Sequence, residues 1–430
     1  MSRPQIGFVG MTHLGLISAT ATAGKGFPVV CYDPDRELIG RLERGSLPIV
    51  EPGLPELLAA NGEIQRFSAD AKAISQCDVV YIAPDVPTDD AGKSDLSDIR
   101  ALIDAAAEVM AADAVMVILC QVPPGFTRSL KVLPSERLYY QVETLVFGCA
   151  VERAMQPERY IVGCAAPERP LDARLAALLG AYGCPILPMR YESAELAKIS
   201  INMCLVASIA VANTLAELCE TIGADWSEIA PTLKLDRRIG PYSYLTPGLG
   251  IGGGNLERDL ATVERLAADY GTDASIVRAW LKNSRHRRDW AARTIRRVVL
   301  DAKPDAAIGV WGLAYKENTH STKNSPSLAI IAQLKGVKIL AHDPAVSPAV
   351  IAGLAIERAE DPLQAARDAD ALMILTPWPQ YGCIEPARIA ATMRGQVVID
   401  PYTVLDRSAA RRAGLVHYTL GRAVAGALPG

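Results

Sequence analysis

Two polar side chains stand one helical turn apart in an otherwise apolar segment. Lys198 and Asn202 lie within residues 191–226, a stretch with helical periodicity and no helix breaker, so they should share one helix face. A lysine buried among apolar side chains needs an anion or a strong acceptor, so the pair indicates a polar ligand. The alternative is a lysine near a helix end whose amine extends to water.

A glycine-rich stretch, 246–259, is the second place where chemistry could occur. Its glycines let backbone amides approach a ligand closely and adopt positive φ angles. They are Gly248, Gly250, Gly252, Gly253 and Gly254. We expect a helix to begin near Asn255, a good N-cap residue, and its first amides would favour an anionic or polar group. The stretch is predicted to be a ligand loop rather than a flexible loop closed by an ordinary cap.

The N-terminus has the layout of a dinucleotide site. A short apolar strand leads through Gly10 and Gly15 into an alanine-rich helix, and the next strand, 28–32, ends at Asp33. In such a β-α-β unit the pyrophosphate lies on the helix N-terminus and the carboxylate binds ribose hydroxyls. Thr12 replaces the usual middle glycine, and an acidic residue rather than an arginine favours NAD over NADP. The alternative is a helix-packing glycine pair followed by an aspartate in a turn.

Strand and helix patterns alternate beyond this unit. Strands at 78–83 and 114–120 flank a helix at 97–111, and Gln121 begins the loop after the second strand. The carboxyl ends of such strands gather beside the first β-α turn, where a doubly wound sheet binds its ligands. The glycine-rich stretch is followed by a second helical region that runs to about residue 300, with a possible break near Gly271.

The chain then repeats its opening pattern. Four segments after residue 304 echo the N-terminal strands, namely 307–312, 337–344, 370–377 and 396–401. The repeat predicts a second Rossmann-like domain. The predicted fold class is therefore α/β, with two Rossmann-like doubly wound domains joined by a central helical region. The predicted boundaries are 1–190, 191–300 and 301–430.

The composition limits which binding partners and which cellular compartment are expected for this protein. A formal net charge of -4 and an isoelectric point near 5.9 argue against nucleic acid and an anionic membrane surface as partners. No apolar stretch reads as long enough to span a membrane, and no signal-peptide layout precedes the first strand. Nine cysteines without a C-x-x-C pair are typical of reduced thiols in a cytoplasm, not of disulfides or a zinc site. We expect a cytoplasmic protein without a metal.

Over nearly its whole length the sequence resembles the UDP-glucose/GDP-mannose (nucleotide-sugar) dehydrogenase family. The motifs that carry the resemblance are G-F-V-G-M-T-H-L-G at 7–15, L-P-I-V-E-P-G-L at 47–54, P-E-R-Y-I-V-G at 157–163, Asn213–Glu217, G-L-A-Y-K at 312–316 and Ser325-Pro326. The resemblance implies NAD as cofactor, a nucleotide sugar as substrate and a homodimer built on the central helices.

Members of this family oxidise a primary alcohol of the sugar to a carboxylate in two NAD-dependent steps. A cysteine thiol captures the intermediate aldehyde, and the resulting thioester is hydrolysed. By resemblance, Lys198 and Asn202 hold the reacting oxygen or an activated water, with Asp259 as the carboxylate partner near that water. Glu143 matches a glutamate linked to thioester hydrolysis. Arg238 matches an arginine that reaches the sugar-nucleotide site, in many members across a subunit interface.

Four departures from the family pattern bear on the chemistry of the site. The family loop G-F-G-G-S-C-F-x-K-D reads G-I-G-G-G-N-L-E-R-D here, so Asn255 replaces the nucleophilic cysteine. An amide cannot add to an aldehyde as a thiolate does, which closes the covalent route to the acid. Gln121 replaces a threonine, and Phe147 replaces a second glutamate, which makes the pocket less charged. Lys323 replaces an arginine, so the charge stays and the two-pronged guanidinium is lost.

The predicted site follows from the motifs and the resemblance together. The catalytic residues are Lys198, Asn202, Asp259, Asn255 and Glu143. The cofactor-binding residues are Gly10, Thr12, Gly15, Asp33, Gln121 and Lys323. The substrate-binding residues are Phe147, Arg238, Tyr242, Gly250, Gly252, Gly253 and Lys316.

The expected function is a single two-electron, NAD-dependent oxidation of a nucleotide sugar, from alcohol to aldehyde or ketone. The residues that polarise a hydroxyl group and handle its proton are kept, and the thioester apparatus is lost. Three alternatives stay open. They are an epimerase that returns the hydride to the other face, a four-electron dehydrogenase that oxidises an aldehyde hydrate, and a silent nucleotide-sugar binder.

Overall fold

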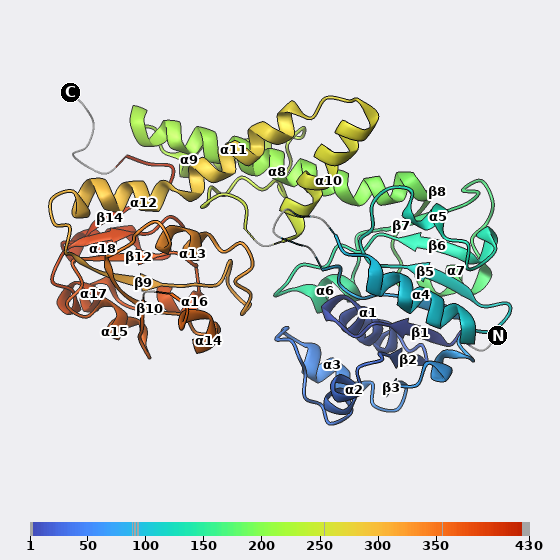
Figure 1. The fold of residues 1–430 in the computed structure, drawn as a ribbon. Helices are drawn as coiled ribbons and strands as arrows, with labels where there is room; N and C mark the ends of the chain where they lie inside the picture. Colours follow the sequence, from blue (N-terminus) through green and yellow to red (C-terminus); the bar gives the residue numbers. More distant parts are fainter. Residues whose placement is uncertain are drawn as a thin grey trace. The chain divides into compact units, whose positions relative to one another are not determined.

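The computed structural model describes residues 3–87, 89, 92, 94–252, 254–354 and 356–423. The chain forms two compact units, Met1–Ile201 and Asn202–Gly430. Figure 1 follows the chain from the blue N-terminal sheet through green and yellow helices to the red C-terminal sheet. The predicted three-part division with boundaries at 190 and 300 stays a prediction.

The N-terminal unit is built on an eight-stranded sheet in the order β3-β2-β1-β4-β5-β6-β7-β8. Its strands are β1 (Ile6–Val9), β2 (Val29–Tyr32), β3 (Gln65–Ser68), β4 (Val79–Ile82), β5 (Val115–Ile118), β6 (Leu138–Gln141), β7 (Tyr160–Cys164) and β8 (Ile186–Arg190). All neighbouring strands are parallel except β6 and β7. The central strands are apolar at consecutive positions because helices cover both faces of the sheet.

Helices complete this unit, and the strand order reverses direction between β1 and β4, as in a doubly wound fold. The helical elements are α1 (His13–Gly24), α2 (Arg36–Glu43), α3 (Leu54–Ala60), η1 (Ala71–Ile74), α4 (Ser97–Val109), α5 (Phe126–Ser129), η2 (Ser135–Arg137), α6 (Ala150–Met155) and α7 (Ala173–Gly180). The predicted Rossmann-like domain is confirmed, although α2, α3, β3 and β6 were not predicted.

The central helix α8 spans Tyr191–Ile222 and is 32 residues long. It ends before Trp226, the predicted end, because Gly223 has a φ of 80° and Asp225 caps the new helix α9 (Trp226–Leu235). Its most apolar 18-residue window has a mean hydropathy of 1.8 and is 33% buried. The expectation that no segment is long and apolar enough to span a membrane is therefore wrong for α8, by length and composition alone.

The helices after the glycine-rich loop pack on α8 within the second unit. They are α10 (Asn255–Tyr270), α11 (Ser275–Arg288), α12 (Trp290–Ile295) and one π-helical turn, η3 (Arg296–Leu300). The predicted break at Gly271 is confirmed, because this glycine closes α10 with a φ of 68°. Val206 from α8 packs with Leu260 and Val277 from the following two helices.

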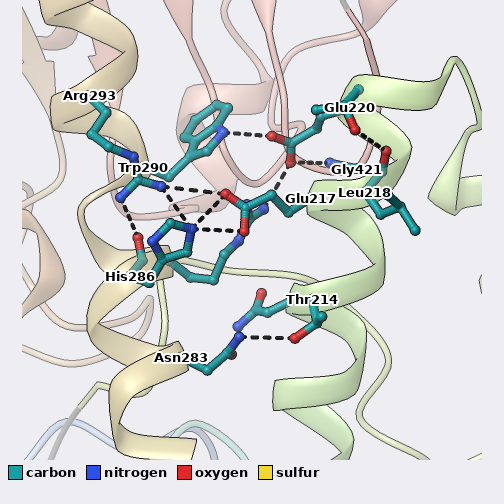
Figure 2. A network of polar contacts seen from close by, with 12 residues as sticks. Thr214, Glu217, Leu218, Glu220, Asn283, His286, Trp290, Arg293 and Gly421 are labelled. Atoms are coloured by element: carbon teal, nitrogen blue, oxygen red, sulfur yellow. Dashed lines mark hydrogen bonds and ion pairs between the residues drawn. The ribbon is translucent and has the colours of Figure 1, made fainter. Parts of the chain in front are cut away.

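A polar network joins these helices to the last strand region of the chain (Figure 2). Glu217 on α8 accepts hydrogen bonds from His286, and Glu220 accepts them from Trp290 and the backbone N–H of Gly421. The fully buried Arg287 donates to Glu220 at 2.8 Å. The network therefore compensates a buried positive charge with carboxylates of α8.

The C-terminal sheet has six parallel strands in the order β11-β10-β9-β12-β13-β14. They are β9 (Ala307–Trp311), β10 (Lys338–His342), β11 (Glu357–Arg358), β12 (Ala371–Ile374), β13 (Val397–Ile399) and β14 (Val416–Tyr418). The helices are α13 (Pro326–Ile331), α14 (Pro348–Ile351), α15 (Pro362–Ala366), α16 (Pro379–Gly382), α17 (Pro386–Thr392) and α18 (Arg407–Arg412). The predicted second Rossmann-like domain is confirmed.

Candidate active site

The turn between β1 and α1 has the geometry of a dinucleotide site. Gly10 has a φ of 91°, and a Cβ at Gly15 would overlap the carbonyl oxygen of Gly10, so both positions need glycine. Helix α1 begins at His13, directly after the turn. The Asp33 carboxylate accepts hydrogen bonds from Met11 N at 2.7 Å and Asp35 N at 2.9 Å. The acidic side chain therefore stays beside the turn, at the end of β2.

Thr12 has an unexpected partner at this turn. Its side chain makes no capping bond to α1. Its hydroxyl oxygen instead accepts a hydrogen bond from Asp85 N at 2.7 Å, and Asp85 Oδ2 accepts one from Leu14 N at 3.4 Å. The sequence reasoning missed Asp85. Its position just after the predicted strand 78–83, at the edge where ligands bind, was the available signal.

Glu143 and Lys198 come together in the N-terminal unit. Glu143 is half-buried just after β6. Burial raises the pKa of its carboxyl group, while a hydrogen bond from Thr144 N and the charge of Lys198 act in the opposite direction. The influence of the lysine places its amine within electrostatic reach of Glu143. Gln121 is half-buried in the loop after β5.

Phe147 packs against a side chain that the sequence reasoning did not select. The rings of Phe147 and His13 have centroids 4.0 Å apart and an interplanar angle of 31°. His13 and Glu51 are both buried, and His13 Nε2 lies 3.2 Å from Glu51 Oε2. The other oxygen of Glu51 accepts from Ala150 N, the first residue of α6. Glu51 thus ties the start of α1 to the end of the loop that carries Phe147.

Asn202 and Asp259 form a buried hydrogen-bonded pair in the second unit. Asn202 Nδ2 donates to Asp259 Oδ2 at 2.5 Å, and the side chains come from α8 and α10. Asp259 is 1% exposed, and Arg258 Nε lies 3.6 Å from its other oxygen. The structure therefore brings together two of the predicted catalytic residues. Lys198 stands one turn before Asn202 on α8.

The glycine-rich loop is anchored by two hydrogen bonds and by close packing. Gly248 N donates to Asn213 Oδ1 at 2.9 Å, and Ile251 N donates to Ser284 Oγ at 2.8 Å. Gly250 has a φ of 72°, and a Cβ there would overlap the backbone of Ser284. A Cβ at Gly252 would lie 3.3 Å from a carbon of the Pro326 ring. These anchors favour an ordered loop over the flexible alternative. The predicted residue Gly253 lies outside the described residues.

Asn255 does not cap α10, which corrects the prediction. Gly254 is the N-cap residue, and no side chain makes a capping hydrogen bond there. Asn255 is the first helical residue and is exposed. Cys219, the closest cysteine in sequence, is buried on α8 among Ala216 and Trp226, and burial raises the pKa of its thiol. It is thus held in its unreactive, protonated form.

A cavity of about 480 Å³ adjoins this loop within the second unit. Its lining includes Tyr242, Gly248 and Gly250, together with Lys234, which was not predicted. Arg238 is largely exposed and forms an ion pair with Asp236 at 2.6 Å. The cavity offers aromatic side chains, backbone amides and one positive charge, a combination that suits a phosphorylated or nucleotide ligand.

Two lysines of the C-terminal domain were also predicted to bind ligands. Lys316 lies 5.8 Å from the ring centre of Tyr315. The charge of Lys323 affects the pKa of Glu257, which lies in the first turn of α10. Burial raises the pKa of that carboxyl group, while a hydrogen bond from Asn324 and the charges of Arg288 and Lys323 lower it. Lys323 therefore lies close to the start of α10. Among the described residues, no group of three or more His, Cys, Asp or Glu side chains could hold a metal.

Comparisons with known proteins agree with this geometry along the whole chain. Three family models of the UDP-glucose/GDP-mannose dehydrogenase family match it, namely the NAD binding domain at residues 4–178, the central domain at 192–285 and the UDP binding domain at 309–407.

Among curated proteins, UDP-glucose 6-dehydrogenase TuaD of Bacillus subtilis is 31% identical, covering 99% of this chain and 95% of its own length. UDP-glucose 6-dehydrogenase of Pseudomonas aeruginosa is 28% identical over 97% of both chains. A solved UDP-glucose dehydrogenase from Pyrobaculum islandicum is 27% identical, with a TM-score of 0.87 and 98% of both chains covered. The chain therefore belongs to the UDP-glucose/GDP-mannose dehydrogenase family and is an NAD-dependent nucleotide-sugar dehydrogenase.

Proposed function

We propose that the protein oxidises one CH–OH group of a nucleotide sugar in a single two-electron step, yielding an aldehyde or a ketone. The observation that carries this proposal is the identity of residue 255. An exposed asparagine stands at the first position of α10, where the family has its nucleophilic cysteine. The buried Asn202–Asp259 pair, which acts on the reacting oxygen, is kept.

The residues of the chain would handle the proton of the substrate hydroxyl. Lys198 holds the hydroxyl oxygen and, in its neutral form, accepts the proton as the carbon loses its hydride. Bound NAD would supply the hydride acceptor, so that one alcohol and one NAD⁺ would give one carbonyl, one NADH and one proton. Asn202 orients the same oxygen through its amide, which Asp259 fixes in one rotamer. Glu143 lies near enough to Lys198 for its charge to favour the protonated amine once the proton has moved.

The reaction would stop at the carbonyl because no nucleophile follows. The amide of Asn255 can donate a hydrogen bond to the substrate or accept one from it, but it cannot form a thiohemiacetal. Cys219 is buried in the apolar cluster on α8 and cannot replace the missing thiol. Without the covalent adduct, the second hydride transfer cannot follow the thiohemiacetal route of the family.

The substrate would be a UDP-sugar or a closely related nucleotide sugar. The curated relatives are named for UDP-glucose, and the family model over residues 309–407 describes a UDP binding domain. We assign the cavity beside Tyr242 and Gly250 to the nucleotide sugar. We further expect Gly252, Arg238 and Lys316, which do not line this cavity, to contribute to binding of the phosphates or the sugar. Phe147 replaces a carboxylate with a ring, so the preferred sugar would be less polar at that position than glucose.

The nicotinamide cofactor would bind at the β1–α1 turn. Gly10, Thr12 and Gly15 would shape the pyrophosphate position, Asp33 would bind the adenosine ribose, and Gln121 would contribute from the loop after β5. The turn fits the group, because α1 presents its first amides there and no side chain at position 15 separates helix and turn.

We also propose a homodimer built on α8. Four apolar side chains spaced by four, three and four residues are 40–64% exposed on this helix, and a second copy of the chain would cover them. They are Val211, Leu215, Leu218 and Ile222. Light scattering should give twice the chain mass for the wild type and the single-chain mass for Leu218→Glu. Binding of the wild type to lipid vesicles instead would contradict both this assignment and the expected cytoplasmic, membrane-free location.

The test of the reaction is the number of NADH molecules formed per sugar consumed, with product mass recorded, over a panel of UDP-, GDP- and dTDP-sugars. One NADH and a loss of two mass units support the proposal. Two NADH and an acid would overturn it and favour a hydrate route. Product formed without NADH would indicate an epimerase. The absence of any turnover would indicate a silent nucleotide-sugar binder.

A matched pair of variants sharpens this test. Asn255→Cys restores the family nucleophile and should add acid to the products, whereas Asn255→Ser should leave one NADH per sugar. Lys198→Met should lower kcat by about 10²–10⁴-fold, the usual contribution of a general base. A wild-type rate for Lys198→Met would remove that residue from the mechanism.

A further inference from the structure

Pro84 and Asp85, shortly after β4, contact the start of α1. Asp85 N donates to Thr12 Oγ1 at 2.7 Å, and Asp85 Oδ2 accepts from Leu14 N at 3.4 Å. Pro84 packs so closely on the turn that a Cβ at Gly10 would lie 2.9 Å from the proline nitrogen. The Asp85 carboxylate is thus held over the first turn of α1.

A dinucleotide needs the same position. The first amides of a Rossmann helix and the positive end of its dipole bind the pyrophosphate. Leu14 N belongs to that first turn and already donates to a carboxylate. Two anions cannot share these amides without strong repulsion. The threonine at position 12 contributes to the arrangement, because a glycine there would offer no hydroxyl to Asp85 N.

We propose that Asp85 tunes the cofactor affinity of this enzyme by competing with the pyrophosphate of NAD for the N-terminus of α1. This inference rests on the proposed location of NAD at the β1–α1 turn. Asp85 is exposed, so its carboxylate rotates into solvent when the cofactor enters. The competition lowers the affinity for NAD, while Thr12 holds the loop backbone in place.

The experiment compares Asp85→Asn with the wild type by calorimetric titration of NADH. Asparagine keeps the size of the side chain and removes its charge, so we expect roughly two- to fivefold tighter binding, the usual range for one charge at a helix N-terminus. ADP-ribose, which keeps the pyrophosphate and lacks the nicotinamide, should show the same gain. The matched control is Asp104→Asn, the same change at an exposed position of α4.

Two further measurements keep the inference separable from the cofactor assignment. Thr12→Gly should tighten NADH binding as well, and its effect should not add to that of Asp85→Asn, because both act through one contact. Asp33→Ala should weaken NADH binding if the turn is the cofactor site. If Asp33→Ala weakens NADH binding but Asp85→Asn leaves it unchanged or weakens it, the inference about Asp85 is wrong and the cofactor assignment stands. No effect of either variant would overturn the cofactor assignment itself.

Discussion

The two Rossmann-like folds of this chain share a turn and use it differently. Gly10 follows β1 with a φ of 91°, and Gly312 follows β9 with a φ of 94°. After the first turn the helix begins at once, at His13, whereas after the second the helix begins only at Pro326. Only the first turn therefore places helix amides where a pyrophosphate would bind.

The aspartates that follow the second strand of each Rossmann-like fold, β2 and β10, also differ in how the protein binds them. Asp33 accepts hydrogen bonds from two backbone N–H groups, Met11 and Asp35. Its counterpart Asp343 is 3% exposed and accepts five bonds, from the backbone N–H groups of Leu313, Ala314, Ala345 and Val346 and from the indole of Trp378. A carboxylate has about four lone-pair sites, so the second is saturated by the protein and the first is not. Strand order alone thus does not make a dinucleotide site.

The largest expected effect comes from crowding the first turn. Gly15→Ala puts a Cβ into the carbonyl oxygen of Gly10, which should abolish NADH binding and lower the free energy of unfolding by about 3 kcal/mol. The measurements are calorimetric titration and urea unfolding. Gly180→Ala at the end of α7 is the control, because its Cβ meets open space and should leave both quantities nearly unchanged. NADH binding by the Gly15 variant at wild-type affinity would show that this turn is not the cofactor site.

A pair of neutralising changes contrasts the two carboxylates. Asp343→Asn leaves buried N–H donors facing an amide N–H₂, so we expect about 2 kcal/mol lower stability and an unchanged KM for NAD. Asp33→Asn should instead raise the KM for NAD and cause a smaller loss of stability than Asp343→Asn. Urea unfolding and initial-rate kinetics measure both. A raised KM in the Asp343 variant would contradict the distinction.

The smallest effect concerns equivalent aspartates before β4 and β12. Asp370 accepts from Arg394, Lys303 and Ala307 N, and these bonds lower the pKa of its carboxyl group despite burial. A lowered folded-state pKa stabilises the fold above the unfolded value, about 3.9 for Asp, and this contribution disappears as the pH falls through the folded value. Because the two cations are half-exposed, Asp370→Asn should cost only about 1 kcal/mol at pH 7.

The stability lost in Asp370→Asn should become smaller below about pH 4, because there the aspartate is protonated in the unfolded chain while it is still ionised in the folded chain. Asp78→Asn is the comparison. Asp78 Oδ2 accepts from Gln5 N in the same way, but its ion-pair partner among the described residues, Arg174, lies 3.9 Å from Oδ1. Asp78→Asn should have a smaller effect at pH 7. Equal losses of stability in the two variants at pH 7 would show that the cations around Asp370 contribute nothing.

The sequence was enough to predict the central strands of both sheets, because they are continuous apolar runs, but it did not predict β3, β6, β11 and β14. Helical spacing indicated Asn202, whereas its partner Asp259, 57 positions away, was indicated only through the family resemblance. Asp85 and the His13–Glu51 pair escaped prediction because their partners lie 73 and 38 positions away. The capping role of Asn255 was wrong because the preceding glycine already turns the backbone into the helix.

The contact between Glu220 and Gly421 has a consequence for biosynthesis. The two residues are 201 positions apart, and Gly421 also accepts a hydrogen bond from Trp226 N through its carbonyl oxygen. At about 5–20 residues per second, a ribosome needs roughly 10–40 s to make the stretch between them. From the synthesis of Arg287 until the end of that interval, its charge lies in a helical layer that lacks its final strand region. A chain released before residue 421 would keep this layer open and present it to proteases, so the end of translation completes the folding of the middle of the protein.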